Sequence, residues 1–333
     1  MIRFGIVGTG KITDEFIMSA RAAGDAEPVA VCSRTEEAGA NHAEKNGLAH
    51  VFASLPDMVR SGKVDAVYIA SPNALHAKQS IICLDEGIPV LVEKSAASNV
   101  MEFEAMTASA QKSGTLLMEA MKSTLVPAFD AIREQLPKLG VIRHYFASYC
   151  QYSSRYDAHL AGEYRNAFDS ALSNGSLLDI GIYGLYPAIQ LFGAPKTVQA
   201  SAGLLSTGVD GYGSLILHYE GMDAVILHAK NSDSWLPAEI QGEKATLRLD
   251  RINLPEKVDL LYRDGRVENI PVSRPDPFMT YEIREFTRLL RNGEKESRIN
   301  SWSVSLETLR VMDEARRQTG VVYPADAKKQ ASR

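Results

Sequence analysis

The chain has 333 residues, 45% of them hydrophobic and 23% charged, which is enough for two globular domains. A net charge of −5 and the absence of Lys/Arg runs argue against a nucleic-acid partner and against an anionic membrane surface. With no leader pattern and no run of about 18 apolar residues, we expect a cytoplasmic protein without a membrane span. The cysteines form no Cys-x-x-Cys pair, so we expect core residues and no metal site at Cys32, Cys83 and Cys150.

The first part of the chain alternates short apolar runs with helical patterns. Its middle runs lack polar alternation, which is typical of strands buried on both faces of a parallel sheet. A capping pattern at Asn99 and Glu102 predicts a helix start. This rhythm predicts an α/β, doubly wound Rossmann dinucleotide-binding domain over residues 1–121. Its predicted strands are 3–7, 28–32, 51–52, 65–70, 89–92 and 115–118.

The rhythm changes after residue 121. Apolar residues at helical spacing predict a helix over 175–192, which ends before Gly193 and Pro195. Alternating runs separated by turns predict an open, largely antiparallel sheet packed on helices. Residues 122–333 are therefore predicted to form a second, substrate-binding α/β domain. The other predicted elements are helices at 128–136, 281–291 and 303–319 and strands at 142–152, 215–219, 224–229, 246–250 and 258–262.

The first predicted strand runs directly into two glycines. Gly8 and Gly10 would bring bare backbone N–H groups and a helix N-terminus to one point, where a pyrophosphate can bind. The third position of the usual Gly-x-Gly-x-x-Gly/Ala motif is Thr13, so an ordinary strand-to-helix turn is the alternative. The predicted cofactor contacts in this segment are Gly8, Thr9, Gly10, Lys11 and Ile12.

Ser33 and Arg34 follow the second strand, at the position that reads the adenosine ribose. A hydroxyl and a guanidinium donate hydrogen bonds to a 2′-phosphate, whereas a carboxylate would repel it. The pair favours NADP, with NAD still possible. The alternatives are a solvated Arg34, or a ribose contact from Glu36 or Glu37.

The loop after the fourth predicted strand lies at the carboxyl edge of the sheet, where such sheets bind ligands. Ser71, Pro72 and Asn73 predict a rigid loop beside the cofactor. His76 comes next, and a structural role is the alternative to a direct contact.

Glu93 and Lys94 come directly after the fifth predicted strand. The Lys94 ammonium could polarise the oxygen of a substrate alcohol or carbonyl beside the nicotinamide. The alternative is a surface ion pair of Glu93.

Asp179 and Tyr183 are four residues apart on the predicted helix and share a face beside its apolar stripe. A phenol can transfer the hydroxyl proton in hydride transfer if a cation lowers its pKa from about 10, and Lys94 is the candidate cation. The alternatives are a core tyrosine and a capping or solvated aspartate.

Taken in order, these motifs resemble the Gfo/Idh/MocA oxidoreductases, and the resemblance covers nearly the whole chain. It rests on G-T-G-K-I, S-P-N-A-L-H, V-E-K, E-A-M at 119–121 and N-G-S-L-L-D-I-G-I-Y at 174–183. The tyrosine form is similar to the branch of glucose-fructose oxidoreductase and dimeric dihydrodiol dehydrogenase. The resemblance implies that Lys94 contacts nicotinamide and substrate, that Tyr183 is the general acid or base, and that Asp179 orients the substrate. Ser95 departs from the proline that the family usually has there.

We therefore predict an NADP-dependent oxidoreductase that moves a hydride between nicotinamide and a secondary alcohol or carbonyl of a sugar, polyol or diol. The alternative is a non-catalytic NADP sensor of the same fold. From their position, Tyr152 and Arg165 are predicted to contact the substrate, and Arg155, Tyr156 and His159 share their loop. The resemblance also implies a homodimer or homotetramer formed through the C-terminal sheet.

Overall fold

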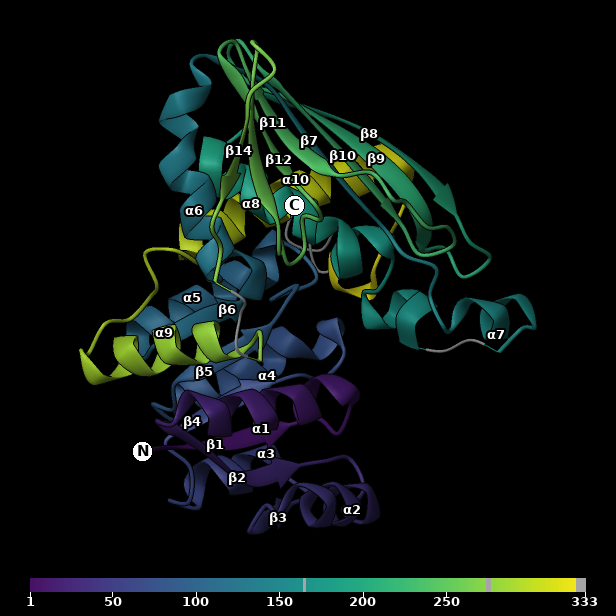
Figure 1. Cartoon of the computed structure of the whole chain (residues 1–333). Coiled ribbons are helices and arrows are strands. Elements are labelled where there is room, and N and C mark those ends of the chain that lie inside the picture. The colour runs from purple at the N-terminus through teal and green to yellow at the C-terminus, as the bar shows by residue number, and fades with distance from the viewer. Residues whose placement is uncertain (164–165, 274–276, 328–333) are drawn as a thin grey trace. The chain divides into compact units, whose positions relative to one another are not determined.

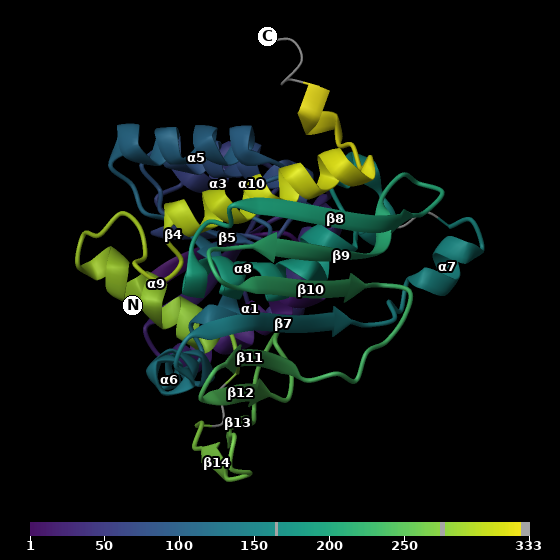
Figure 2. The ribbon, with the colours of Figure 1, turned by 90° about the horizontal axis from the view of Figure 1, so that it is seen from above.

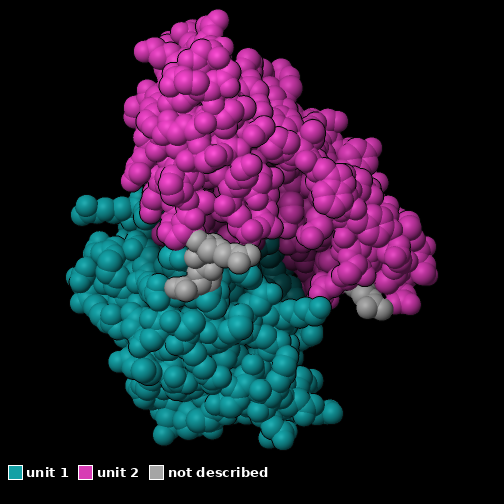
Figure 3. Space-filling view, in the orientation of Figure 1, with its two compact units in different colours: residues 1–122, 275–305 teal, residues 123–274, 306–333 magenta. Residues whose placement is uncertain are grey.

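The structure is a computed structural model that describes residues 1–163, 166–273 and 277–327. It divides into two compact units, residues 1–122 with 275–305 and residues 123–274 with 306–333 (Figures 1 and 3). The sequence predicted a single boundary after residue 121. The structure differs because the chain returns to the first unit after the second sheet.

The first unit contains a parallel six-stranded sheet in the order β3-β2-β1-β4-β5-β6. Each predicted strand is present within two residues of its expected ends. The order reverses between β1 and β4, and a doubly wound sheet binds its ligand at the carboxyl ends of the strands at such a switch point. The strands are β1 Ile2–Val7, β2 Ala26–Cys32, β3 His50–Phe52, β4 Ala66–Ile69, β5 Val90–Glu93 and β6 Leu117–Ala120.

Capping residues mark the ends of several helices in this unit. Asn99 caps α5 by accepting the N–H of Glu102 at 3.0 Å, while Gly47 and Gly114 close α2 and α5 in the left-handed region. The helices are α1 Lys11–Ala23, α2 Glu36–Asn46, α3 Leu55–Arg60, α4 Asn73–Asp85 and α5 Val100–Ser113.

A later helix, α9 (Thr280–Arg291), belongs to the first unit because its apolar face packs beside α1. The rings of Phe4 on β1 and Phe286 on α9 lie 5.6 Å apart, and Thr287 donates a hydrogen bond of 2.7 Å to Asp25. Periodicity predicts this helix but not which sheet it covers.

The second unit contains an eight-stranded sheet in the order β14-β13-β12-β11-β7-β10-β9-β8. β7 and β10 are parallel and the other pairs are antiparallel, which confirms the predicted open sheet (Figure 2). The strands are β7 Ile142–Cys150, β8 Thr197–Leu204, β9 Asp210–His218, β10 Asp223–Ala229, β11 Ala238–Gly242, β12 Ala245–Leu249, β13 Val258–Tyr262 and β14 Val267–Ile270.

Helix α8 (Ile182–Phe192) packs on one face of this sheet. Figure 2 shows the helix behind the strands. Gly184 permits the close approach, because a Cβ there would lie 2.8 Å from Ile226, and Tyr145 donates to the Gly184 carbonyl at 2.9 Å. A π-helical turn, Leu177–Gly181, precedes α8. The other helices are α6 Pro127–Gln135, α7 Tyr156–Leu160 and α10 Trp302–Thr319, with short 3₁₀ turns at Lys122–Thr124, Leu136–Leu139, Asn166–Phe168, Ser170–Leu172 and Pro324–Asp326.

Within the described ranges, no helix is both long and apolar enough to cross a bilayer. The same residues contain no group of three or more His, Cys, Asp or Glu side chains arranged to hold a metal ion.

Candidate active site

The glycine turn after β1 has different requirements at its two glycines. Gly8 has φ +117°, and a Cβ there would lie 2.7 Å from the backbone oxygen of Ala70. Gly10 begins α1 with φ −84°, and no atom lies within 4 Å of where its Cβ would be. The backbone conformation and the nearby Ala70 carbonyl therefore require glycine at position 8. The space at Gly10 lets a ligand approach the first turn of α1.

The departure at the third motif position has a structural explanation. Thr13 is fully buried, and its hydroxyl donates a hydrogen bond of 2.6 Å to the Gly10 carbonyl. This side chain also lies 3.3 Å from Nε2 of His42 on α2. Thr13 therefore packs inside the unit and leaves the glycine turn intact.

Arg34 follows β2, at the position where the adenosine ribose of a dinucleotide is expected. Arg34 is exposed, and within the described residues its guanidinium has no hydrogen bond or ion pair. The neighbouring Thr35 caps α2, and Glu36 and Glu37 lie exposed in the first turn of that helix. Ser33 and Arg34 therefore fit a 2′-phosphate in charge and exposure.

His76 connects the loops after β4 and β5. It is 1% exposed, with Nε2 lying 2.7 Å from the Ser71 carbonyl oxygen and Nδ1 lying 2.9 Å from that of Ser95. Burial lowers the pKa of His76, and the two carbonyl contacts oppose that shift. His76 thus holds two loops of the predicted cofactor site, and its direct contact with a cofactor stays a prediction.

The other predicted residues of the first loop lie at the start of α4. Pro72 occupies the N-cap position without a side-chain cap hydrogen bond, and Asn73, the first residue of that helix, is 9% exposed. The Ser71 hydroxyl donates to Oε1 of Gln79 at 2.6 Å. Contacts of Ser71 with Gln79 and His76 therefore hold this loop against α4, and its contact with a cofactor stays a prediction.

Glu93 is a buried residue of β5, so a surface ion pair is excluded for it. Its Oε1 accepts the Tyr68 hydroxyl at 2.5 Å, and its Oε2 accepts the backbone N–H of Lys94 at 3.2 Å. These contacts fix the main chain where the half-buried Lys94 begins, and the Lys94–Ser95 peptide bond is cis. Glu93 therefore acts on the backbone of Lys94.

The first unit also buries two further carboxyl groups whose pKa values are raised by burial. The pKa of Glu119 is raised to about 7, although the carboxylate accepts the N–H of Ala96 at 2.9 Å. Glu282 on α9 is fully buried, neither of its oxygens has a hydrogen-bond partner among the residues that the structure describes, and its pKa is raised well above the usual range. The negative charge of the neighbouring Glu93 raises the pKa values of both carboxyl groups further.

Asp179 and Tyr183 lie at the start of the helix predicted to carry them. Asp179 belongs to the π-helical turn and Tyr183 to the first turn of α8. Asp179 has a 36% exposed side chain, and Tyr183 is 8% exposed with its ring 5.5 Å from that of Tyr149. Single π turns are rare in proteins and occur frequently at functional sites.

A buried polar cluster that the sequence analysis missed anchors this helix. Oδ2 of Asp210 on β9 accepts the N–H of Leu177 and the hydroxyl of Ser176, each at 2.6 Å. The Ser176 hydroxyl also lies 2.7 Å from Nδ1 of His228. Burial raises the pKa of Asp210 to about 6 and lowers that of His228 to about 3. No sequence pattern distinguishes these residues from other polar strand positions.

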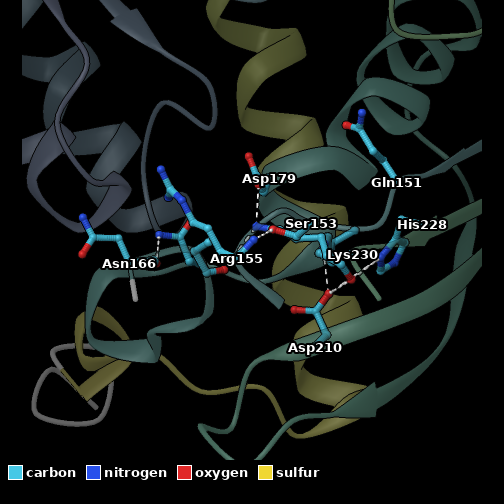
Figure 4. A network of polar contacts seen from close by, with 12 residues as sticks. Gln151, Ser153, Arg155, Asn166, Asp179, Asp210, His228 and Lys230 are labelled. Carbon is cyan, nitrogen blue, oxygen red and sulfur yellow. Dashed lines mark hydrogen bonds and ion pairs between the residues drawn. The ribbon is translucent and has the colours of Figure 1, made fainter. Parts of the chain in front are cut away.

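Lys230 was also missed. Its Nζ lies 2.6 Å from Oδ2 of Asp179, and Figure 4 shows the two side chains joined by a dashed line. A signal was present, because Lys230 directly follows the apolar strand β10, just as Lys94 follows β5.

The structure describes most of the loop after β7. Tyr152 is exposed and donates to Oδ1 of Asp157 at 2.6 Å. His159 is buried, its ring stacked on Tyr156 and 5.1 Å from Phe168, so it serves the core of this loop. Arg165 lies outside the described residues.

Comparison with known proteins identifies the family. Residues 2–121 match the model of the oxidoreductase family with an NAD-binding Rossmann fold, and residues 133–248 match the Gfo/Idh/MocA C-terminal domain. The chain belongs to the Gfo/Idh/MocA oxidoreductases. The resemblance inferred from the motifs is thereby confirmed, together with the Rossmann and C-terminal folds.

Several relatives of this Gfo/Idh/MocA protein span its full length. It is 51% identical over 326 residues to a scyllo-inositol 2-dehydrogenase (NADP⁺) of Bacillus subtilis, covering 98% of this chain and 99% of the relative. It is 29% identical to a trans-1,2-dihydrobenzene-1,2-diol dehydrogenase of Xenopus tropicalis, covering 97% and 99%. A 3-ketoreductase from Actinomadura kijaniata, solved with NADP and TDP-benzene, has the same fold, with a TM-score of 0.83, 23% identity and coverage of 96% and 98%.

Proposed function

We propose that this protein is an NADP-dependent oxidoreductase that moves a hydride between nicotinamide and a secondary alcohol or carbonyl carbon of a polyol or diol. The observation that carries the proposal is the full-length, 51% identity to a scyllo-inositol 2-dehydrogenase that uses NADP⁺. The dihydrodiol dehydrogenase relative supports the same substrate class, because both named substrates carry neighbouring hydroxyl groups. Scyllo-inositol is therefore the first substrate to test.

The choice of NADP is supported by the ribose position. Arg34 is an exposed guanidinium without a partner among the described residues, and Ser33 lies beside it. The open space at Gly10 fits a pyrophosphate against the helix start. When bound, the nicotinamide supplies or accepts the hydride.

The roles of the chain's own residues are proposed from their chemistry. In the oxidative direction, Tyr183 takes the hydroxyl proton as the C–H hydride leaves, and in reduction it returns that proton to the oxygen. The Lys94 ammonium stabilises the negative charge that develops on the same oxygen. Asp179 accepts a hydrogen bond from a second substrate hydroxyl and so orients the ring. Contacts from Tyr152 and Arg165 stay predictions.

The test follows reduced-nicotinamide absorbance with NADP and scyllo-inositol, and with NADPH and the matching inosose. Tyr183→Phe and Lys94→Ala should each lower kcat at least 100-fold, since a positioned acid or base contributes about 10² to 10⁴. NADPH affinity, measured by fluorescence titration, should persist in Tyr183→Phe. Wild-type turnover in Tyr183→Phe contradicts the proposal.

A sensor that binds NADP without turnover is the second candidate, motivated by Ser95 in place of the family proline. Tight NADPH binding with no turnover of any polyol, aldose or diketone tested would favour it. Restoring the family residue in Ser95→Pro supplies a control, because a gain of activity would trace the loss to this position.

We also propose that the protein forms a homodimer or homotetramer through the second sheet. Phe146, Val225 and Ile216 are directly paired across β7, β10 and β9, so they share the face opposite the buried residues beside α8. All three remain partly exposed. Phe146→Glu should convert the oligomer to monomer in light scattering, with the edge change Val267→Glu as control. A monomeric wild type contradicts this proposal. The cytoplasmic location stays a prediction.

A further inference from the structure

Lys230 is a buried cation held in one position. Its backbone N–H, directly after β10, donates to the Gly211 carbonyl at 2.8 Å, and the residue is 4% exposed. Its ammonium contacts Oδ2 of Asp179 at 2.6 Å and the Ala167 carbonyl at 3.2 Å, and it lies 4.9 Å from the centre of the Phe168 ring. A carboxylate, a carbonyl and a ring face therefore surround the charge.

Asp179 is the exposed partner of this pair. Its side chain is 36% exposed, against 5% for that of Lys230, so the contact approaches the carboxylate from the protein interior (Figure 4). A carboxylate accepts hydrogen bonds and donates none. With Oδ2 held by Lys230, the carboxylate is oriented to receive a donor from the solvent side.

The turn that carries Asp179 is held at two points. Asp210 binds its backbone through the N–H of Leu177, and Lys230 binds its side chain. Both contacts come from strands of the sheet, β9 and the end of β10, so the sheet sets where this carboxylate lies.

We propose that Lys230 is a positioning residue that holds the Asp179 carboxylate ready to accept a hydroxyl next to the reacting carbon, which makes a vicinal diol or α-hydroxy ketone the substrate class. The inference rests on the proposed function. A surface ion pair would not have this effect, because its side chains move and are screened by water. The buried Lys230 ammonium instead holds the partly exposed Asp179 side chain at a fixed place on the sheet.

The test is a double-variant cycle with scyllo-inositol and NADP as the probe. Lys230→Met should raise KM and lower kcat/KM at least tenfold, while NADPH affinity stays within twofold of wild type. Asp179→Asn should give a loss at least as large. The double variant should be no worse than Asp179→Asn, because Lys230 acts through that carboxylate. Losses that multiply, or an unchanged Lys230→Met, overturn the proposal.

Two controls separate positioning from general stability. Lys196→Met removes a lysine of the same unit that pairs with Glu220 on the surface, and it should leave KM unchanged. If Lys230→Met fails to fold, Asp179→Asn is compared with the double variant, in which no unpaired charge is buried. Equal kcat/KM supports the proposal, and any further loss of more than about threefold contradicts it.

The outcome is distinguishable from a failure of the proposed function. If Tyr183→Phe is inactive while Lys230→Met behaves as wild type, the enzyme assignment stands and the positioning role is wrong. If Tyr183→Phe retains full turnover, the proposed function fails and this inference fails with it.

Discussion

Oδ2 of Asp210 accepts the backbone N–H of Leu177 at 2.6 Å, so a residue of β9 caps the helix that carries Asp179 and Tyr183. The same oxygen accepts the Ser176 hydroxyl, and the residue is 2% exposed. A strand side chain thereby supplies the acceptor that a helix start requires and that its own preceding residues do not provide.

Asp210→Ala should therefore destabilise the fold and reduce activity together. Loss of a cap typically costs about 1 kcal/mol, and the buried N–H left without an acceptor costs about 1 to 3 kcal/mol. We expect a lower midpoint in urea unfolding and a lower kcat. Asp210→Asn keeps an acceptor oxygen and should retain most of both, and equal losses in the two variants would argue against capping.

Gly8→Ala and Gly10→Ala should behave differently although the positions are two residues apart. At Gly8 a Cβ meets the Ala70 carbonyl at 2.7 Å and φ is +117°, so we expect both stability and NADPH binding to fall. At Gly10 the Cβ has room in the protein, so the melting temperature should hold while NADPH affinity drops at least tenfold. Unchanged affinity in Gly10→Ala would contradict the proposed pyrophosphate site.

Arg34→Ala should weaken NADP binding without a matching effect on NAD. A charge-assisted hydrogen bond to the 2′-phosphate contributes about 1.5 to 3 kcal/mol, which corresponds to at least about a tenfold rise in Kd. Calorimetric titration with both nucleotides provides the comparison. If the two affinities fall equally, Arg34 does not read the 2′-phosphate.

Glu282→Met should stabilise the protein at neutral pH. Glu282 is fully buried, and within the described part of the chain neither carboxyl oxygen has a hydrogen-bond partner, so the side chain bears a desolvation cost that a thioether of similar length avoids. We expect a gain of about 1 to 3 kcal/mol in the free energy of unfolding. A loss of stability would show that the carboxyl has a partner in solution. Ile283→Ala, in the adjacent buried position, should destabilise and serves as the control.

Titration of Glu119 should lower the free energy of unfolding as the pH rises from 4.5 to about 7. Burial raises its folded-state pKa from 4.5 to about 7, so the folded protein retains a proton that the unfolded chain has released. This contribution is complete below pH 4.5 and is lost as pH rises through about 7. The unfolding free energy of wild type minus that of Glu119→Gln should fall across this window, by about 3 kcal/mol in total. A flat or rising difference in urea unfolding would contradict the assignment.

Local patterns were sufficient for much of this protein. Short apolar runs located all six strands of the first sheet, and the Asn99 cap marked a helix start correctly, because strand burial and capping depend on neighbours in sequence. The order of motifs from Gly8 to Tyr183 was enough to recognise the family, which the comparisons confirm.

The sequence by itself determined the strands of the first sheet, the two folds and the family, since these follow from periodicity and from motifs that are contiguous in the chain. Only the tertiary structure showed that α9 belongs to the first unit, that His76 is enclosed by two carbonyls, and that Lys230 and Asp210 hold the helix of Asp179. Most of these relationships join residues that are far apart in the sequence, such as His76 and Ser95, 19 positions apart, and Asp179 and Lys230, 51 positions apart. The order of the strands and the burial of side chains decide which of these residues meet. No local sequence pattern predicts either.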